Sequence, residues 1–82
     1  MTESHKNYLH DVGAELREIA LEAKKRAAAA RGTEKEEFES GRAWAFYEVV
    51  SLMQSEAVTF ELPPEDLHFE GFDADRDLIG LG

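Results

Sequence analysis

A helix stop signal followed at once by a helix start signal constrains this chain more than any other feature. Gly32 follows an alanine-rich run and suits the left-handed backbone that closes a helix. Thr33 and Glu36 then have the spacing of a capping box, which opens a helix. Signals this close together predict an antiparallel αα-hairpin with a tight turn over residues 31–33.

The stretch before the turn predicts a helix over about residues 4–30. Its apolar residues recur every three or four positions and form a narrow stripe: Leu9, Val12, Leu16, Ile19, Ala20, Ala23, Ala27 and Ala30. Gly13 lies on this stripe, where we expect it to allow close helix approach. Small side chains near the end of this helix leave room for larger ones on the next helix.

The stretch after the turn predicts a second helix over about residues 34–58. At 100° per residue, its main apolar face consists of Phe38, Ala45, Phe46, Val49, Leu52 and Met53, and an extension of that face consists of Ala43, Val50 and Ala57. The resulting arc covers about half of the circumference, whereas one helix contact covers a stripe of roughly 100°. We therefore expect a second surface to cover the remainder.

Residues 61–82 form an acidic tail with aromatic residues. Pro63 and Pro64 end the second helix, and the motif PEDL predicts one helical turn with Pro64 near its first position. The tail carries too many large apolar residues for a free acidic segment: Leu62, Leu67, Phe69, Phe72, Leu78, Ile79 and Leu81. We expect a helical hairpin over residues 1–60, with the tail docked on it or on a partner.

The small size of the chain favours self-association. A domain of 82 residues buries only about 60 % of its unfolded surface, and without cysteine no disulfide can reinforce it. The predicted fold class is all-α, with two hairpins assembling as a dimeric four-helix bundle. Trp44 and Tyr47 lie off the main face and predict a second contact surface. The candidate interface residues are Phe38, Trp44, Phe46, Tyr47, Val50, Met53, Phe60, Phe69 and Phe72.

Charge and hydropathy narrow the class of partner. The net charge is −9, which disfavours non-specific binding to nucleic acid or to an anionic membrane. No segment approaches the roughly 18 apolar residues of a membrane span, and residues 1–10 lack the pattern of a secretory signal. We expect a cytoplasmic protein, of bacterial type, that pairs with itself.

No motif predicts catalysis, a metal or a cofactor. Asp73, Asp75 and Asp77 have the first spacings of a calcium-binding EF-hand loop, but Leu78 replaces the required glycine and the twelfth position lies beyond Gly82. The three histidines, His5, His10 and His68, have no metal-ligand spacing. No nucleophile, base and orienting group can be recognised together, so an enzyme is not expected.

Two functions remain open on the sequence alone. The first is a protein–protein interaction or regulatory module. The alternative is a nucleic-acid-linked regulator, acting either through its acidic surface as a mimic of nucleic acid or through a basic cluster near the turn: Lys24, Lys25, Arg26 and Arg31.

Overall fold

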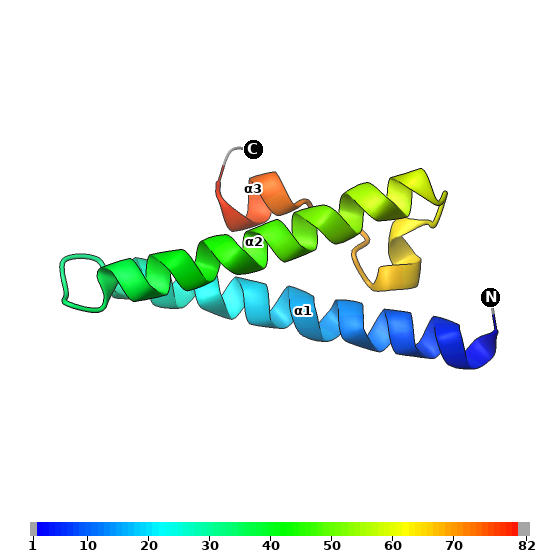
Figure 1. Cartoon of the computed structure of the whole chain (residues 1–82), viewed down its shortest axis with the longest axis horizontal. Helices are drawn as coiled ribbons and strands as arrows, with labels where there is room; N and C mark the ends of the chain where they lie inside the picture. The colour runs from blue at the N-terminus through cyan, green and yellow to red at the C-terminus, as the bar shows by residue number, and fades with distance from the viewer. Residues whose placement is uncertain (1, 81–82) are drawn as a thin grey trace.

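Two long antiparallel helices dominate the computed structural model, which describes residues 2–80 (Figure 1). Helix α1 spans Glu3–Ala29 and α2 spans Glu36–Thr59. The tail adds a short 3₁₀ helix, η1, over Pro64–Leu67, and a short helix, α3, over Ala74–Leu78. Residues 2–80 contain no strand, which confirms the all-α class, and the molecule measures 47 × 24 × 16 Å.

The turn between α1 and α2 is longer than predicted. It occupies residues 30–35, and α2 begins at Glu36 instead of residue 34. The predicted capping box is wrong, because the Thr33 hydroxyl donates to the carbonyl of Ala30 and the Glu36 carboxylate accepts from the amide of Gly32. Both side chains therefore close the turn. Gly32 has a φ of +78°, as the stop signal predicts.

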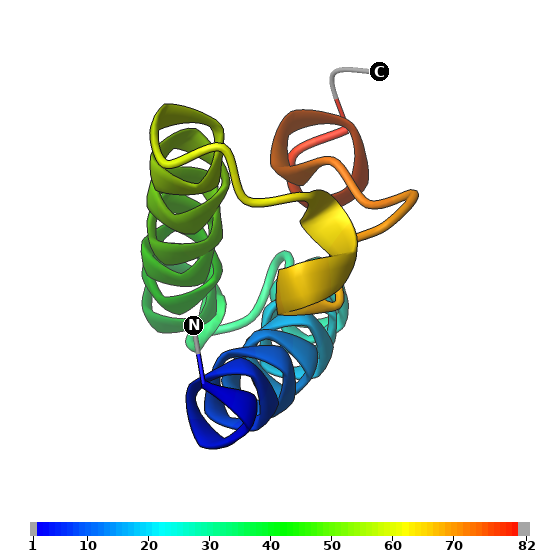
Figure 2. The same ribbon diagram turned by 90° about the vertical axis from the view of Figure 1, so that its right-hand side faces the viewer.

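The tail packs against its own hairpin and completes the core. The chain turns away from α2, forms η1 against α1 and then returns as α3 beside α2, so that the tail covers one side of the hairpin (Figure 2). Leu67 and Phe69 are 3 % and 2 % exposed, and Phe72 and Leu78 are also buried. Pro64 is the first residue of η1, as predicted from the motif PEDL.

This docking decides which part of the apolar arc of α2 is buried. Val50 is fully buried and Ala57 nearly so, whereas Phe38, Val49 and Leu52 remain exposed. The deepest burial on α2 is therefore on the extension of the apolar face, at Val50 and Ala57, and not on its main face. The tail supplies Phe72, Ala74 and Leu78 on the Val50 side, and α1 supplies Ala20 to the same cluster.

Gly13 permits the closest approach between α1 and the tail. A Cβ atom at Gly13 would overlap the backbone carbonyl of Leu67 in η1. The predicted role of Gly13 in close packing is thus present, but its neighbour is the tail and not α2. Nothing lies within 4 Å of a Cβ atom built at Gly41 in α2.

Polar contacts hold the rest of the tail. The Gln54 side chain donates to the carbonyl of Phe72 (2.9 Å) and accepts from the amide of Ala74 (3.1 Å). The Arg17 guanidinium donates to the carbonyl of His68 (3.1 Å) and lies 4.8 Å from the centroid of the Phe72 ring. Across residues 2–80, neither long helix has the length of apolar sequence that a bilayer crossing needs.

Candidate interaction surface

One flank of α2 exposes large apolar side chains on the side that the tail leaves uncovered. We call this flank, formed by Phe38, Ala45, Val49 and Leu52, the α2 outer face. Phe38 is 69 % exposed, Leu52 60 % and Val49 40 %, and Ala45 is also exposed. The spacings of seven, four and three residues place all four on one stripe of the helix. Exposed apolar groups gathered on one stripe are typical of an interaction surface.

Charged residues border the α2 outer face. The Arg42 guanidinium lies 5.0 Å from the centroid of the Phe46 ring, and its Nη1 atom is buried without a hydrogen-bond acceptor among residues 2–80. Glu48 is exposed, and its side chain makes no hydrogen bond or ion pair within residues 2–80. The α2 outer face is thus bordered by the half-buried guanidinium of Arg42 and by the exposed side chain of Glu48.

The structure divides the predicted interface residues into three groups. Val50, Phe69 and Phe72 are buried inside this chain, because the tail and the hairpin pack on one another, and they offer no surface to a partner. Phe46, Tyr47 and Met53 are half-buried. Phe38, Trp44 and Phe60 are exposed, but only Phe38 lies on the α2 outer face.

Trp44 and Tyr47 lie together on the flank where the tail docks. Their ring centroids are 5.1 Å apart. The Tyr47 hydroxyl donates to the carboxylate of Asp75, and this hydrogen bond is the largest cause that raises the pKa of Tyr47. Trp44 also lines an open cavity of about 460 Å³ between the two long helices and Leu78 of α3. The tail of the same chain therefore covers part of this flank.

The open end of the hairpin contains a small apolar cavity of about 160 Å³. It lies between α1, the end of α2 and the tail, and its lining residues are Leu9, Met53, Glu56, Ala57, Phe60, Leu62 and Leu67. Phe60, at 70 % exposed, forms its outer wall. Leu9 of α1 thus lies near Met53 and Phe60 at this end of the hairpin.

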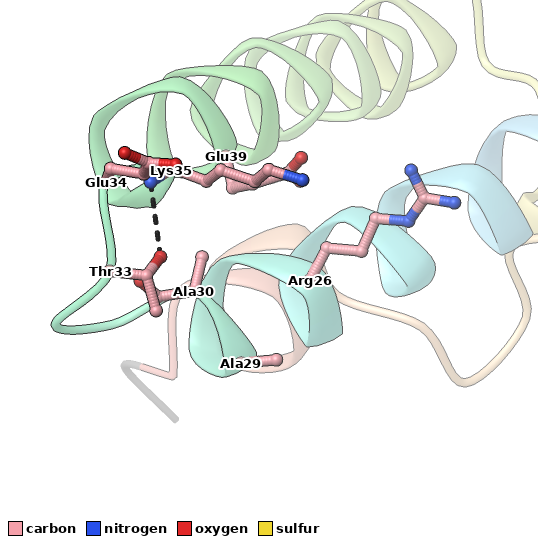
Figure 3. Close-up of a pocket in the computed structure, with 7 residues that line it drawn as sticks. All are labelled: Arg26, Ala29, Ala30, Thr33, Glu34, Lys35 and Glu39. Carbon is pink, nitrogen blue, oxygen red and sulfur yellow. Dashed lines mark hydrogen bonds between the residues drawn. The ribbon is translucent and has the colours of Figure 1, made fainter.

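The turn end carries charges of both signs. Figure 3 shows Arg26 of α1 facing Lys35 of the turn and Glu39 of α2 across an open groove of about 470 Å³. Within the basic cluster, Lys24 donates to the carbonyl of Asp77 (2.9 Å) and Arg26 pairs with Glu22 (3.4 Å). Two of the four cations are thus engaged inside the chain, and the cluster does not form one uninterrupted positive surface.

The three aspartates of the tail are used in the structure of α3. Asp73 accepts from the amide of Arg76 and caps the helix, and Asp75 accepts from Tyr47. Asp77 pairs with Arg76 at 2.8 Å, which together with the amide of Asp73 lowers the pKa of Asp77 to about 2. Within residues 2–80, no three histidine, aspartate or glutamate side chains are placed to hold a metal ion.

A histidine pair joins α1 to the tail, and sequence reasoning missed it. The Nε2 atom of His10 lies 2.8 Å from the Nδ1 atom of His68, with the two rings edge to face. The two residues are 58 positions apart, so no local spacing could indicate the contact. His68 has a φ of +61°, a backbone conformation that is uncommon for histidine and aims its ring at α1.

Comparison with known proteins gives no match: no family model, no curated protein and no solved structure is significantly similar to this chain. The functional argument therefore depends on the geometry of its surfaces. Of these, the α2 outer face has the most exposed apolar side chains on one stripe.

Proposed function

We propose that this chain is a small helical interaction module that associates with a second copy of itself through the α2 outer face. The observation that carries the proposal is the exposure of Phe38, Val49 and Leu52 on one uncovered flank of α2. Burial of apolar surface stabilises an assembly by about 25 cal/mol for each Å² that is removed from contact with water. Pairing two hairpins along this flank would bury all three.

The thin core supports the same proposal. Val50 is the largest side chain that is fully buried within residues 2–80, and the other buried helix residues are mainly alanine and glycine. A second copy would add buried apolar area that one chain of this length does not supply. Nucleic acid is not part of the proposal, because the net charge is −9 and two cations of the basic cluster are engaged internally.

Sedimentation velocity over a range of concentrations tests the proposal. We expect a species of twice the mass of one chain at micromolar concentration. Leu52→Glu should shift this species to the monomer, because each buried leucine contributes about 1.5–3 kcal/mol and a dimer contains two, which corresponds to at least a hundredfold weaker association.

Val58→Glu is the matched control. Val58 is 79 % exposed and lies on α2, but on a different side from the outer face. It should leave the dimer intact. A wild-type chain that sediments as a monomer throughout the micromolar range would refute the proposal.

A further inference from the structure

One cavity, on the flank where the tail docks, differs in charge from the rest of the molecule. It is the open cavity of about 460 Å³ between α1, α2 and α3 that Trp44 helps to line. Lys24 and Arg31 also line it, and none of the described residues around it is acidic, although the chain has 18 acidic residues and a net charge of −9. By contrast, glutamates line both the groove at the turn and the apolar cavity at the open end.

The two cations of this cavity keep hydrogen-bond donors for a ligand. The Lys24 ammonium donates one of its three N–H groups to the carbonyl of Asp77 at 2.9 Å, which holds it against α3. The Asp77 carboxylate pairs with Arg76 at 2.8 Å and does not line the cavity. Within residues 2–80, no carboxylate forms an ion pair with Lys24 or Arg31. The cavity therefore has two positive groups that no direct ion pair neutralises.

The remaining walls of the cavity are mainly apolar. Leu78 and Ile79 of the tail, alanines of both long helices and Trp44 supply them. Trp44 is 53 % exposed, so the fold leaves much of this large aromatic side chain uncovered beside the cavity. Cavities of roughly 300–1,000 Å³ with apolar walls and a few polar groups are typical of small-molecule sites.

We infer that this cavity binds a free organic carboxylate with an aromatic body. Charge complementarity identifies the carboxylate, which accepts charge-assisted hydrogen bonds from Lys24 and Arg31. The apolar walls identify the body, because an aromatic ring that packs against Trp44 gains more than its buried area alone provides. The cavity lies on a different flank from the α2 outer face, so ligand binding and the proposed self-association are independent of one another.

Lys24 and Arg31 are the groups that attract an anion to this place, because their surroundings repel one. Helix α1 ends at Ala29, next to the cavity-lining Ala28, and the last carbonyls of a helix carry partial negative charge. The net charge of −9 also repels an anion. Loss of either cation should therefore weaken binding of a carboxylate.

Trp44 provides the measurement in the full-length chain, because the sequence contains no other tryptophan. The probe is phenylpropionate, and phenylpropionamide is its neutral match of the same shape. Phenylpropionate should shift the emission of Trp44 to shorter wavelength as it displaces water from the ring, with a dissociation constant on the order of 1 mM for a ligand of this size. The amide should bind about tenfold more weakly. Cyclohexylpropionate, which keeps the charge but lacks the aromatic ring, should bind about two- to tenfold more weakly.

Charge-removing variants test which cations hold the carboxylate. Arg31→Gln and Lys24→Gln should each weaken the binding of phenylpropionate about two- to fivefold, and the double variant about tenfold. Lys25→Gln is the matched control, because it removes the same charge from the neighbouring exposed position of α1, which does not line the cavity. It should leave the dissociation constant unchanged.

Filling the cavity tests the location of the site without changing its charge. Ala28 is exposed and lines the cavity, so Ala28→Leu should occupy part of the space and abolish the response of Trp44 to phenylpropionate. Ala29→Leu is the control, because Ala29 is also exposed but lines the groove at the turn instead. Circular dichroism establishes that both variants keep the helix content of the wild-type chain.

Each outcome either supports this site or overturns it. No saturable change in Trp44 emission up to roughly 10 mM phenylpropionate, ten times the expected constant, overturns it. Equal binding of the amide overturns the anion site, and equal binding of cyclohexylpropionate overturns the aromatic body. Equal weakening by Arg31→Gln and Lys25→Gln would assign the effect to the general field of the protein and not to the cavity. Binding that depends on Arg31 but not on Lys25, and that Ala28→Leu blocks, establishes the site.

Discussion

Gly13 is the residue at which the local preference of the helix and the packing of the tail conflict most directly. Alanine at this position would favour the helical backbone by about 1 kcal/mol. Its Cβ atom would, however, overlap the carbonyl of Leu67, and a backbone atom cannot move aside as a flexible side chain can. We expect Gly13→Ala to destabilise the protein by about 1–3 kcal/mol, as for overpacked cores, and to lower the midpoint of thermal unfolding.

Gly41→Ala is the matched control for Gly13→Ala. In dilute protein, where association does not contribute, it should raise stability by about 1 kcal/mol because the added methyl group meets nothing. Equal effects of the two substitutions would show that the tail does not approach α1 at Gly13.

Arg17 is the second residue of α1 that holds the tail. Its guanidinium donates to the carbonyl of His68 at 3.1 Å and to that of Glu70 at 3.4 Å, and it lies against the Phe72 ring. Arg17→Met keeps the length of the side chain but leaves these carbonyls without their donor. We expect a loss of about 1.5–3 kcal/mol in urea unfolding, the range for hydrogen bonds to charged groups.

Arg26→Met provides the comparison for Arg17→Met on the same helix. Among the described residues, Arg26 pairs only with Glu22, one turn earlier, and both side chains are more than half exposed. Such a pair contributes about 0.3–0.5 kcal/mol. A loss at Arg26 as large as that at Arg17 would contradict the role assigned to Arg17.

At the scale of elements, α3 is short and depends on the ionisation of its own carboxylates. Arg76 and the amide of Asp73 lower the pKa of Asp77 from 3.8 to about 2. Because the pKa is lower in the folded chain, the ionised form stabilises α3. This contribution is complete above a pH of about 4 and is lost as the pH falls towards 2. The amide resonances of residues 74–78 should therefore change over this range before those of α1 and α2.

Asp77→Asn tests whether Asp77 causes that transition. The variant should remove the acid-induced change from α3, because residue 77 no longer titrates. Glu65→Gln, on η1 and outside this network, should leave the change in place. An unchanged acid profile in Asp77→Asn would assign the transition to another group.

The long elements were predictable because their signals are local and repeated. Both helices extend over many turns of periodic apolar residues, and their observed ends differ from the predicted ones by one or two residues. The start of α2 was misplaced because the capping-box spacing does not reveal that Thr33 and Glu36 bond within the turn. The helix α3 has five residues, too few for a period to be recognised.

The candidate site was only partly predictable, for a geometric reason. An apolar arc of half the circumference indicates that α2 has more than one partner, but it does not say which part each partner covers. That division depends on where the tail docks, and the docking depends on contacts between residues far apart in sequence, such as Gly13 with Leu67 and Gln54 with Phe72. Trp44, predicted to lie on a contact surface, is 53 % exposed beside α3 and not on the α2 outer face.

At the scale of the whole molecule, the tail is part of the core and the hairpin alone is incomplete. Leu67, Phe69, Phe72 and Leu78 of the tail are all at most 8 % exposed. Each such side chain contributes about 1.5–3 kcal/mol when fully buried, so the four together are comparable to the total stability of about 5–15 kcal/mol of a small domain. We expect deletion of residues 62–82 to abolish cooperative thermal unfolding and to cause aggregation through the newly exposed Val50.

A single substitution in the full-length chain checks the same prediction without removing the charges of the tail. Phe69→Ala should lower the free energy of unfolding by about 3–5 kcal/mol, because Phe69 is only 2 % exposed and removing its ring leaves a cavity in the core. Phe60→Ala is the control, since Phe60 is 70 % exposed and its removal leaves the core intact. Substitutions on the α2 outer face should instead change association and leave the unfolding of dilute protein unchanged. A truncated chain that melts at the wild-type temperature and stays in solution would instead mean that the hairpin is stable alone, and would make the tail a detachable segment.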